Sequence, residues 1–278
     1  MVVLRRGIAA LFLVMTSAGC AAGSAADAGR STRPSSSSAS ATTAGPVRPA
    51  ITSPGRPAAS SSGASDDPGA VLRAPTVSAK ARAAGLVDIR AIIPSAVVDL
   101  RYTTSDNFVG VPLYPRDARC LIHESMQAGL TAAAEQLSRD GEVLVFWDCY
   151  RPHAVQVRMF QIVPNPDWVA RPGPFATSHE AARSVDVTLA QAATNVDCAA
   201  AQRVQGHCLL DMGTGFDDFS ARAHAFATDG VSAQAQANRA RLRAAMNSGG
   251  ITVYSGEWWH FDGRGADVAR PHLDVPVN

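Results

Sequence analysis

Two short segments of the chain carry histidines and carboxylates at spacings that can hold a metal ion. One segment reads Ser-His-Glu-Ala-Ala-Arg, and its histidine, His179, is followed seven residues later by Asp186. Near the C-terminus, Glu257 stands three residues before His260. Two histidines and a carboxylate with one open position are a typical zinc site for hydrolysis. The first segment is not an H-E-x-x-H zinc helix, because Arg183 stands where the second histidine would be.

Each of these residues also has an ordinary structural interpretation. Asp186 falls on the polar side of an alternating strand and could face water at a sheet edge. His260 follows two tryptophans and is compatible with a buried core histidine. In a regular strand Glu257 and His260 point to opposite faces, so both can serve one metal only if the chain kinks there. Arg151 directly follows a predicted buried strand, where it either aims a fixed charge into a site or lies on the surface.

Composition excludes several other classes of enzyme. Lys80 is the only lysine, so residues 81–278 have none for a Schiff base, a P-loop or a Ser-x-x-Lys site. The chain has no G-x-S-x-G motif. Its 25 basic residues balance 24 acidic ones to a net charge of +1, which argues against a nucleic-acid partner. A metal-activated water is the nucleophile that remains.

The elements that must position these residues follow from hydrophobic periodicity. It predicts strands at 97–102, 143–147, 183–189, 251–254 and 258–261, and helices at 121–137 and 233–246. In the strand 183–189, Ser184, Asp186 and Thr188 share one face, opposite three aliphatic residues. Helices and strands mix without a regular βαβ alternation. The predicted fold class is therefore α+β, with a largely antiparallel sheet flanked by helices.

The chain divides into a leader and one folded domain. Two arginines, a short apolar run and small residues up to Cys20 predict a signal peptide over residues 1–20. Ser17-Ala-Gly-Cys20 resembles a lipoprotein processing site, with ordinary cleavage and no lipid as the alternative. In residues 21–70, 41 of 50 positions are Ala, Gly, Ser, Thr or Pro, so 21–80 is expected to be a disordered linker. Residues 81–278 form the expected folded domain.

Export changes the interpretation of the four remaining cysteines. Cys120, Cys149, Cys198 and Cys208 are an even set in an oxidising compartment, so two disulfides are expected. Cys198 and Cys208 enclose a short segment and close a loop most readily, which leaves Cys120 for Cys149. A cysteine zinc site is the alternative, but the chain has no C-x-x-C.

Several motifs occur in order between residues 97 and 262. They are Tyr102-Thr-Thr-x-x-Asn-Phe-x-Gly, Trp147-Asp-x-Tyr-Arg-Pro152, His179 to Asp186 with Val-Thr-Leu following, Phe216-Asp217, Asn238 to Met246, and Tyr254-Ser-x-Glu-Trp-Trp-His260. Together they resemble the D-alanyl-D-alanine dipeptidases of the VanX type, zinc peptidases related to bacterial cell-wall carboxypeptidases. The resemblance implies a hedgehog/DD-peptidase-like fold with one Zn²⁺ per chain in a cleft on the sheet.

By position, the resemblance also implies roles for single residues. His179, Asp186 and His260 would be the zinc ligands. Glu257 would be the general base, and Arg151 would stabilise the oxyanion of the tetrahedral intermediate.

The substrate-binding residues implied by the resemblance are Asp217, Tyr102 and Thr177. Asp217 would pair with the free ammonium group of a dipeptide, and Tyr102 would line the same pocket. Thr177 replaces the serine that is usual in the family, which adds a methyl where the substrate carboxylate is expected. Ala182 replaces a usual glycine, and alanine would strain the loop if this position needs a positive φ.

The resemblance and the leader together predict zinc-dependent hydrolysis of D-Ala-D-Ala or close D,D-dipeptides in cell-wall turnover outside the cytoplasm. The protein would be a cell-envelope lipoprotein or secreted, and would touch the membrane only through a lipid on Cys20. The alternatives are a carboxypeptidase that trims longer wall peptides and a non-catalytic wall-binding module.

Five histidines have no assigned role and are expected at the surface or behind the site: His123, His153, His207, His224 and His272.

Overall fold

The computed structural model describes residues 77–194 and 196–278. The predicted signal peptide, Cys20 and the linker up to residue 76 lie outside the described residues. The helices are α1 (Ala79–Ala83), α2 (Ile89–Ile92), α3 (Gln127–Arg139), α4 (His153–Ile162) and α5 (Ala233–Ser248). Short 3₁₀ turns are η1 (Arg101–Thr103), η2 (Glu124–Met126), η3 (Ser178–Ala181), η4 (Ala200–Gln202) and η5 (Ala221–Ala223). The predicted boundary at residue 81 falls inside α1.

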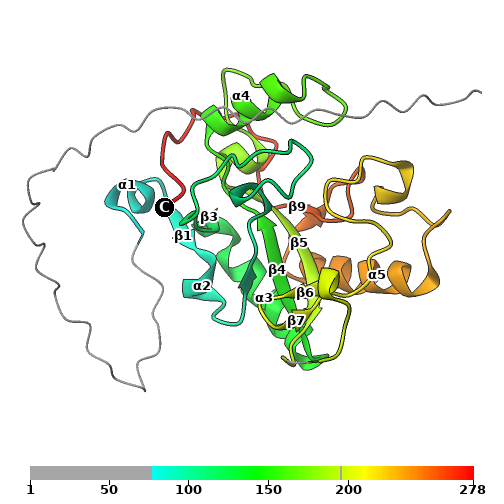
Figure 1. Ribbon diagram of the computed structural model, residues 1–278. Helices are drawn as coiled ribbons and strands as arrows, with labels where there is room; N and C mark the ends of the chain where they lie inside the picture. The colour runs from blue at the N-terminus through cyan, green and yellow to red at the C-terminus, as the bar shows by residue number, and fades with distance from the viewer. Residues whose placement is uncertain (1–76, 195) are drawn as a thin grey trace, which may run out of the picture. The chain divides into compact units, whose positions relative to one another are not determined.

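A five-stranded sheet forms the centre of the fold, in the order β2-β4-β5-β9-β8 (Figure 1). Its strands are β2 (Val97–Val98), β4 (Glu142–Asp148), β5 (Ser184–Gln191), β8 (Thr252–Val253) and β9 (His260–Asp262). The pair β2–β4 is parallel and the other three pairs are antiparallel. Two small antiparallel sheets pair β1 (Leu86–Asp88) with β3 (Leu121–His123) and β6 (Arg203–Val204) with β7 (His207–Cys208). The predicted α+β class with a largely antiparallel sheet is confirmed.

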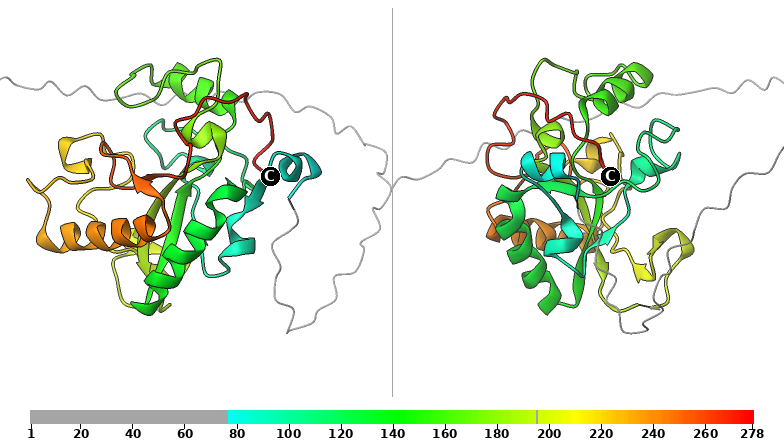
Figure 2. Two further views of the ribbon diagram at one scale, coloured as in Figure 1. Left: turned by 180° about the vertical axis from the view of Figure 1, so that it is seen from behind. Right: turned by 90° about the vertical axis from the view of Figure 1, so that its left-hand side faces the viewer.

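One face of the central sheet carries the hydrophobic core. Helices α3 and α5 pack against each other, and they contact β4, β5 and β8 on this side (Figure 2). Val185 and Val187 of β5 are fully buried in the core, as the alternation predicts. Asp186 on the other face is also buried, with 3% of its surface exposed, because β5 lies between β4 and β9. The interpretation of Asp186 as an edge-strand residue facing water is therefore wrong.

Two predicted elements differ from the structure near their ends. Leu121 and Ile122 were assigned to a helix but form strand β3, and α3 begins only at Gln127. Both side chains are completely buried, so they fit the helical spacing although the backbone is extended. The strand predicted over 97–102 ends at Val98, and Tyr102 lies in the turn η1. Helix α4, which the periodicity did not reveal, follows directly after Pro152.

The structure contains two disulfides, Cys120–Cys149 and Cys198–Cys208, which is the pairing that the spacing favours.

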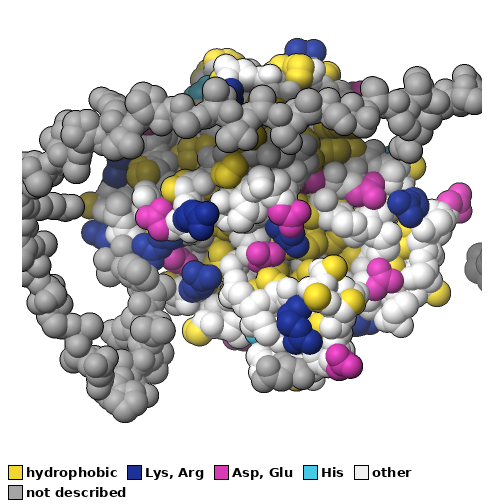
Figure 3. All heavy atoms as spheres, in the orientation of Figure 1, with side chains coloured by type: hydrophobic (Ala, Val, Ile, Leu, Met, Phe, Trp, Pro, Cys, Tyr) yellow, Lys and Arg dark blue, Asp and Glu magenta, His cyan; other side chains and the backbone are white. Residues whose placement is uncertain are grey.

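Acidic and basic side chains are interspersed over the described surface that Figure 3 shows, as expected from the balanced charge. No helix among the described residues combines the length and the apolar character needed to cross a bilayer.

The turn between η3 and β5 requires a left-handed backbone at a residue other than glycine. Ala182 has a φ of 56° and is completely buried, so the strain expected from alanine at this position is present. Its neighbour Ala181 is also buried but does not have a positive φ. An L-residue in this region costs roughly 1–2 kcal/mol, which glycine avoids.

This strain predicts opposite responses to glycine at two adjacent buried alanines. Ala181→Gly should lower the free energy of unfolding by roughly 1–2 kcal/mol through backbone entropy and a lost methyl contact. Ala182→Gly should change the free energy by less than about 0.5 kcal/mol, because relief of strain offsets the same losses. Urea unfolding with a chelator present keeps metal binding out of the comparison. Equal losses in the two variants would contradict a strained Ala182.

Candidate active site

The register of three neighbouring strands places the polar residues of the site in one row. In the antiparallel pair β4–β5, Asp148 lies opposite Asp186, and in the pair β5–β9, Asp186 lies opposite His260. Residues directly opposite each other in antiparallel strands point to the same face of the sheet. The three side chains therefore project together from the face opposite to helices α3 and α5.

The three side chains proposed as metal ligands converge on one point. His260 Nδ1 lies 3.0 Å from Asp186 Oδ1. His179 Nε2 lies 3.2 Å from His260 Nδ1 and 3.3 Å from the same Asp186 oxygen. In a tetrahedral site with bonds of about 2.0–2.1 Å, neighbouring ligand atoms stand about 3.3–3.4 Å apart. The triangle of donor atoms thus has the size that a small divalent ion requires.

Hydrogen bonds on the far side of each ring fix which nitrogen faces this point. His179 Nδ1 lies 2.8 Å from the carbonyl oxygen of Cys149, so Nδ1 carries a proton and Nε2 presents its lone pair. His260 Nε2 lies 3.1 Å from Asp262 Oδ1 and donates a hydrogen bond to it. The other ring nitrogen, Nδ1, is therefore the atom of His260 that can bind a metal ion. Ligand histidines are typically oriented in this way by a carbonyl or a carboxylate. The donor set fits a divalent metal ion.

The charges around these atoms favour a cation. Burial raises the pKa of Asp186, but His179 and His260 lower it more, so this carboxyl is ionised. Burial lowers the pKa of His260, but its hydrogen bonds to Asp186 and Asp262 raise it more strongly, to about 10. The centre therefore attracts positive charge, either as a proton on His260 or as a metal ion that displaces that proton.

Glu257 reaches the same point because the chain is not a regular strand where it was predicted to be one. Strand β9 begins only at His260, and Glu257 lies in the turn before it. Its Oε2 atom lies 3.9 Å from His260 Nδ1. Burial raises the pKa of Glu257 above its ordinary value, and Asp186 adds to this, while His260, His179 and Arg151 oppose it. The kink that the sequence required is present, and it places a carboxylate beside the three donor atoms.

Arg151 faces the cavity from the end of β4 and is held in position by two side chains. Its Nη2 and Nε atoms donate to Asp148 Oδ2 at 2.6 and 3.1 Å, and Nη1 donates to Gln156 Oε1 at 2.8 Å. Burial lowers the pKa of Arg151, but Asp148 raises it more, so the guanidinium keeps its charge. Only 12% of its side chain is exposed, which excludes the surface interpretation.

Asp148 also contributes to the site, although the sequence predicts no role for it. It is completely buried, and besides Arg151 it accepts hydrogen bonds from Tyr114 Oη at 2.6 Å and from the backbone N–H of Cys149 at 2.9 Å. Burying a carboxylate is costly unless it has hydrogen-bond partners of this kind. Asp148 therefore positions the guanidinium. The signal available in the sequence was an aspartate at the end of an otherwise apolar strand.

Asp217 and Tyr102 meet in the same cavity. The Tyr102 hydroxyl donates to the Asp217 carboxylate, at 3.1 Å from Oδ2 and 3.3 Å from Oδ1. Burial raises the pKa of Asp217 well above its ordinary value, and the negative charge of Asp186 raises it further. An additional cation beside Asp217 would relieve this cost.

Helix α5 holds the segment that carries Asp217. Asn238 Nδ2 donates to the carbonyl of Asp211 at 2.6 Å, and Arg239 Nε donates to the carbonyl of Met212 at 2.7 Å. Arg239 Nη1 also donates to the carbonyls of Arg222 and His224. Arg239 is 1% exposed and acts through the backbone on both sides of Asp217. Arg239 lies in the segment from Asn238 to Met246 that carries part of the resemblance, but the sequence predicts no function for it.

The side chains proposed to bind metal and substrate line one cavity of about 360 Å³, within the usual range for a small-molecule site, whereas Asp148, Asn238 and Arg239 support it from outside. It contains every residue to which the resemblance assigns a metal, catalytic or substrate role: Tyr102, Arg151, Thr177, His179, Asp186, Asp217, Glu257 and His260. Phe108, Trp168 and Phe219 form an aromatic wall, in which the rings of Trp168 and Phe219 stack 4.8 Å apart.

The five histidines without an assigned role do not enter this cavity. His123 contacts Arg183, His207 Nδ1 lies 2.9 Å from the carbonyl of Gln191, and the side chain of His224 is exposed. The remaining two, His153 and His272, lie together beside Glu180.

Comparison with known proteins identifies the family of this chain. A family model described as D-Ala-D-Ala dipeptidase (peptidase M15) matches residues 82–278. The D-alanyl-D-alanine dipeptidase of Escherichia coli K12 is 34% identical over 177 residues, which cover 64% of this chain and 83% of that protein. The D-alanyl-D-alanine dipeptidase of Enterococcus faecium is 29% identical over 191 residues, which cover 64% of this chain and 91% of that protein. The chain therefore belongs to the D-Ala-D-Ala dipeptidase family of metallopeptidases.

Proposed function

We propose that this chain hydrolyses D-Ala-D-Ala, or a closely related D,D-dipeptide, with a single zinc ion, outside the cytoplasm. The observation that carries the proposal is the triangle of lone-pair donors from His179, Asp186 and His260, with Glu257 and Arg151 facing the same cavity. A binding module with a purely structural metal would need neither the carboxylate nor the guanidinium.

The donor set of two imidazoles and one carboxylate is the one that zinc takes in hydrolytic sites. When bound by His179, Asp186 and His260, zinc would lower the pKa of a water molecule and polarise the scissile carbonyl. The Cys149 carbonyl and Asp262 keep the two imidazoles in the tautomers that binding requires.

Glu257 would accept the proton of the attacking water and return it to the leaving amine. Its raised pKa suits this exchange, because a base with a pKa closer to neutral can both take and release a proton. Arg151 would donate hydrogen bonds to the oxygen that becomes negative in the tetrahedral intermediate. Since Asp148 and Gln156 already fix its position, little reorganisation is needed when that charge develops.

The substrate would be oriented by its two charged ends. Asp217 would pair with the free ammonium group, which supplies the cation that this buried carboxylate lacks. Tyr102 holds the Asp217 carboxylate by its hydroxyl and would therefore act on the substrate indirectly. Thr177 lines the cavity beside His179, where its hydroxyl would meet the substrate carboxylate.

The location proposed for this reaction depends on the leader. Residues 1–20 have the pattern of an export signal, and the two disulfides of the folded domain form readily in an oxidising compartment. Outside the cytoplasm, the enzyme would act on peptides released during turnover of the cell wall. Cys20 would carry the lipid that anchors the chain.

The role of Glu257 predicts a large loss of activity without a loss of metal. Glu257→Gln should reduce kcat for D-Ala-D-Ala roughly 100- to 10,000-fold, since a general base is removed. Zinc content, measured by atomic emission, should stay at the wild-type value. A chelator should abolish wild-type activity, and added zinc should restore it. Glu135→Gln, on the exposed surface of α3, is the matched control. A fully active Glu257→Gln variant would refute the assigned role.

The role of Asp217 predicts selectivity for a free N-terminus. Asp217→Asn should lower kcat/KM for D-Ala-D-Ala by roughly 10- to 100-fold, because a charge-assisted hydrogen bond to the ammonium is weakened. It should leave the low activity on N-acetyl-D-Ala-D-Ala unchanged. Asp218→Asn, at a carboxylate that accepts from the Ser220 N–H instead, is the control. Equal losses on both substrates would favour the carboxypeptidase alternative.

The leader predicts a processed, membrane-attached protein. After expression of the full chain in a bacterium, the mature form should fractionate with membranes, and Cys20→Ala should remove that attachment. Immunoblots of the fractions with an antibody against the folded domain would measure both effects. Full-length, unprocessed protein in the cytosol would contradict the proposed location.

A further inference from the structure

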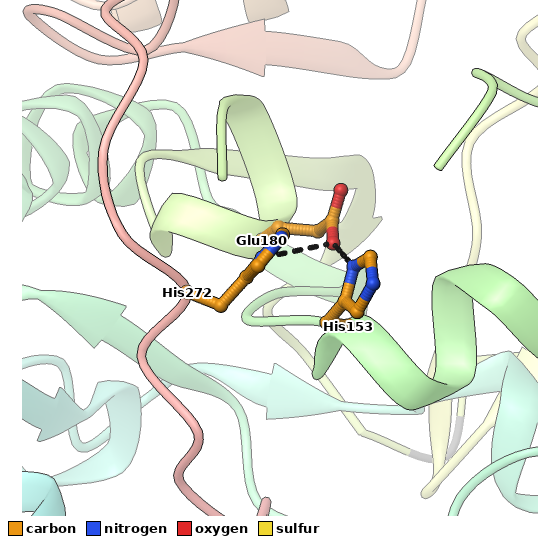
Figure 4. Close-up of side chains that lie close together, drawn as sticks. All are labelled: His153, Glu180 and His272. Atoms are coloured by element: carbon orange, nitrogen blue, oxygen red, sulfur yellow. Dashed lines mark hydrogen bonds and ion pairs between the residues drawn. The ribbon is translucent and has the colours of Figure 1, made fainter. Parts of the chain in front are cut away.

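A second group of metal-ligating side chains lies outside the ligand triangle just described. His153 at the start of α4, Glu180 in η3 and His272 in the C-terminal segment come together, and their ligand atoms all lie within 4.8 Å of one another (Figure 4). His153 Nδ1 lies 2.7 Å from Glu180 Oε1, and His272 Nδ1 lies 3.5 Å from the same oxygen. We propose that His153, Glu180 and His272 form a second site for a divalent transition-metal ion.

The hydrogen bonds of His272 leave one nitrogen available as a ligand. Its Nε2 lies 3.1 Å from the carbonyl of Gly173, which can only accept, so Nε2 carries a proton. Its Nδ1 is buried and has no hydrogen-bond partner. Nδ1 faces Oε1 of Glu180 at 3.5 Å, which is longer than an ordinary hydrogen bond. A cation between the two atoms would satisfy both.

An ordinary ion pair does not account for the whole group. The contact between His153 and Glu180 accounts for the distance of 2.7 Å, but His272 Nδ1 remains 3.5 Å from the same oxygen without a hydrogen bond. The two imidazole rings also lie against each other, with their centroids 3.8 Å apart and their planes inclined by 33°. In Figure 4 both dashed contacts converge on the Glu180 carboxylate from the two rings.

The donor set indicates which metals would bind. Two imidazoles and one carboxylate suit zinc, copper or nickel better than magnesium or calcium, which prefer oxygen ligands. The carboxylate gives the site one negative charge, and a three-residue set leaves at least one position for water.

The second site is less preorganised than the catalytic one. The contacts of Glu180 with His153 and His272, 2.7 and 3.5 Å, are unequal, whereas the ligand atoms of His179, Asp186 and His260 stand 3.0 to 3.3 Å apart. His153 must rotate to open the shorter contact, and its side chain is 35% exposed and has room to do so. We therefore expect weaker binding at this site, after the catalytic site has filled.

A metal at this position would tie three segments together. Glu180 is 27 residues from His153 along the chain and directly follows His179. His272 belongs to a C-terminal segment without regular structure, which runs back past Tyr150, whose hydroxyl accepts from the backbone N–H of Val275. Binding would therefore stabilise the turn that carries His179 and dock the C-terminal segment on it.

The test is the stoichiometry of zinc binding to the full chain, by calorimetric titration and by atomic emission after dialysis. Wild type should bind one zinc tightly and a second more weakly. His272→Ala and His153→Ala should each lose the weaker zinc and keep the tight one. His207→Ala, at a histidine bonded to a backbone carbonyl elsewhere, should bind two. His260→Ala should lose the tight zinc and keep the weaker one, which separates this proposal from the catalytic one.

Thermal unfolding supplies a second readout. At a zinc concentration about a hundredfold above the weaker Kd, the Tm of wild type should rise by roughly 5 °C over that of the singly loaded protein. His272→Ala and His153→Ala should show no such rise. A single equivalent in wild type, or a second equivalent that survives in both variants, would overturn the proposal. Because D-Ala-D-Ala hydrolysis is measured with one equivalent bound, its success or failure is independent of this result.

Discussion

The active site depends on the pairing register of strands β4, β5 and β9. This register sets Asp148, Asp186 and His260 side by side on one face of the sheet. A slip of one residue in any of these strands would turn its side chain into the hydrophobic core. The opposite face of β5 prevents such a slip, because Val185 and Val187 are fully buried against the helices. The hydrophobic core thus fixes the register of the strands that carry the polar groups.

The cavity gathers more negative charge than it neutralises by itself. Of the buried carboxylates, Asp148 is paired with Arg151, and Asp186 lies beside His260, whose pKa is raised to about 10 by Asp186 and Asp262. Glu257 and Asp217 have no fixed cation of their own, and burial raises the pKa of both. In the proposed function, a metal ion and the ammonium group of the dipeptide would each bring positive charge close to these carboxylates.

Hydrophobic periodicity predicts much of the fold. The residues of the site are predicted by the sequence motifs instead. Alternation in 183–189 separated the core face from the polar face, but it could not show that β5 is a central strand, which depends on pairing with distant segments. The kink at Glu257 was required by chemistry before it was seen in the structure. The helix predicted from Leu121 began too early, because buried apolar residues in a short strand resemble one side of a helix. Arg239 was missed because its hydrogen bonds go to backbone carbonyls, which leave no trace in side-chain patterns.

The turn from Thr177 to Ala182 combines strained backbone with side chains that point in different directions. Ser178 and Ala182 both have a positive φ, which costs stability at residues other than glycine. Between them the chain turns sharply enough that consecutive side chains face different groups of residues. His179 points to the catalytic centre, while Glu180 points to His153 and His272. In a regular helical turn, the angle between the directions of two consecutive side chains is fixed. Such a turn could not direct His179 towards the cavity and Glu180 towards His153 and His272. If ions bind at both centres, the turn is held from two sides, and the free energy of binding offsets the strain of its backbone.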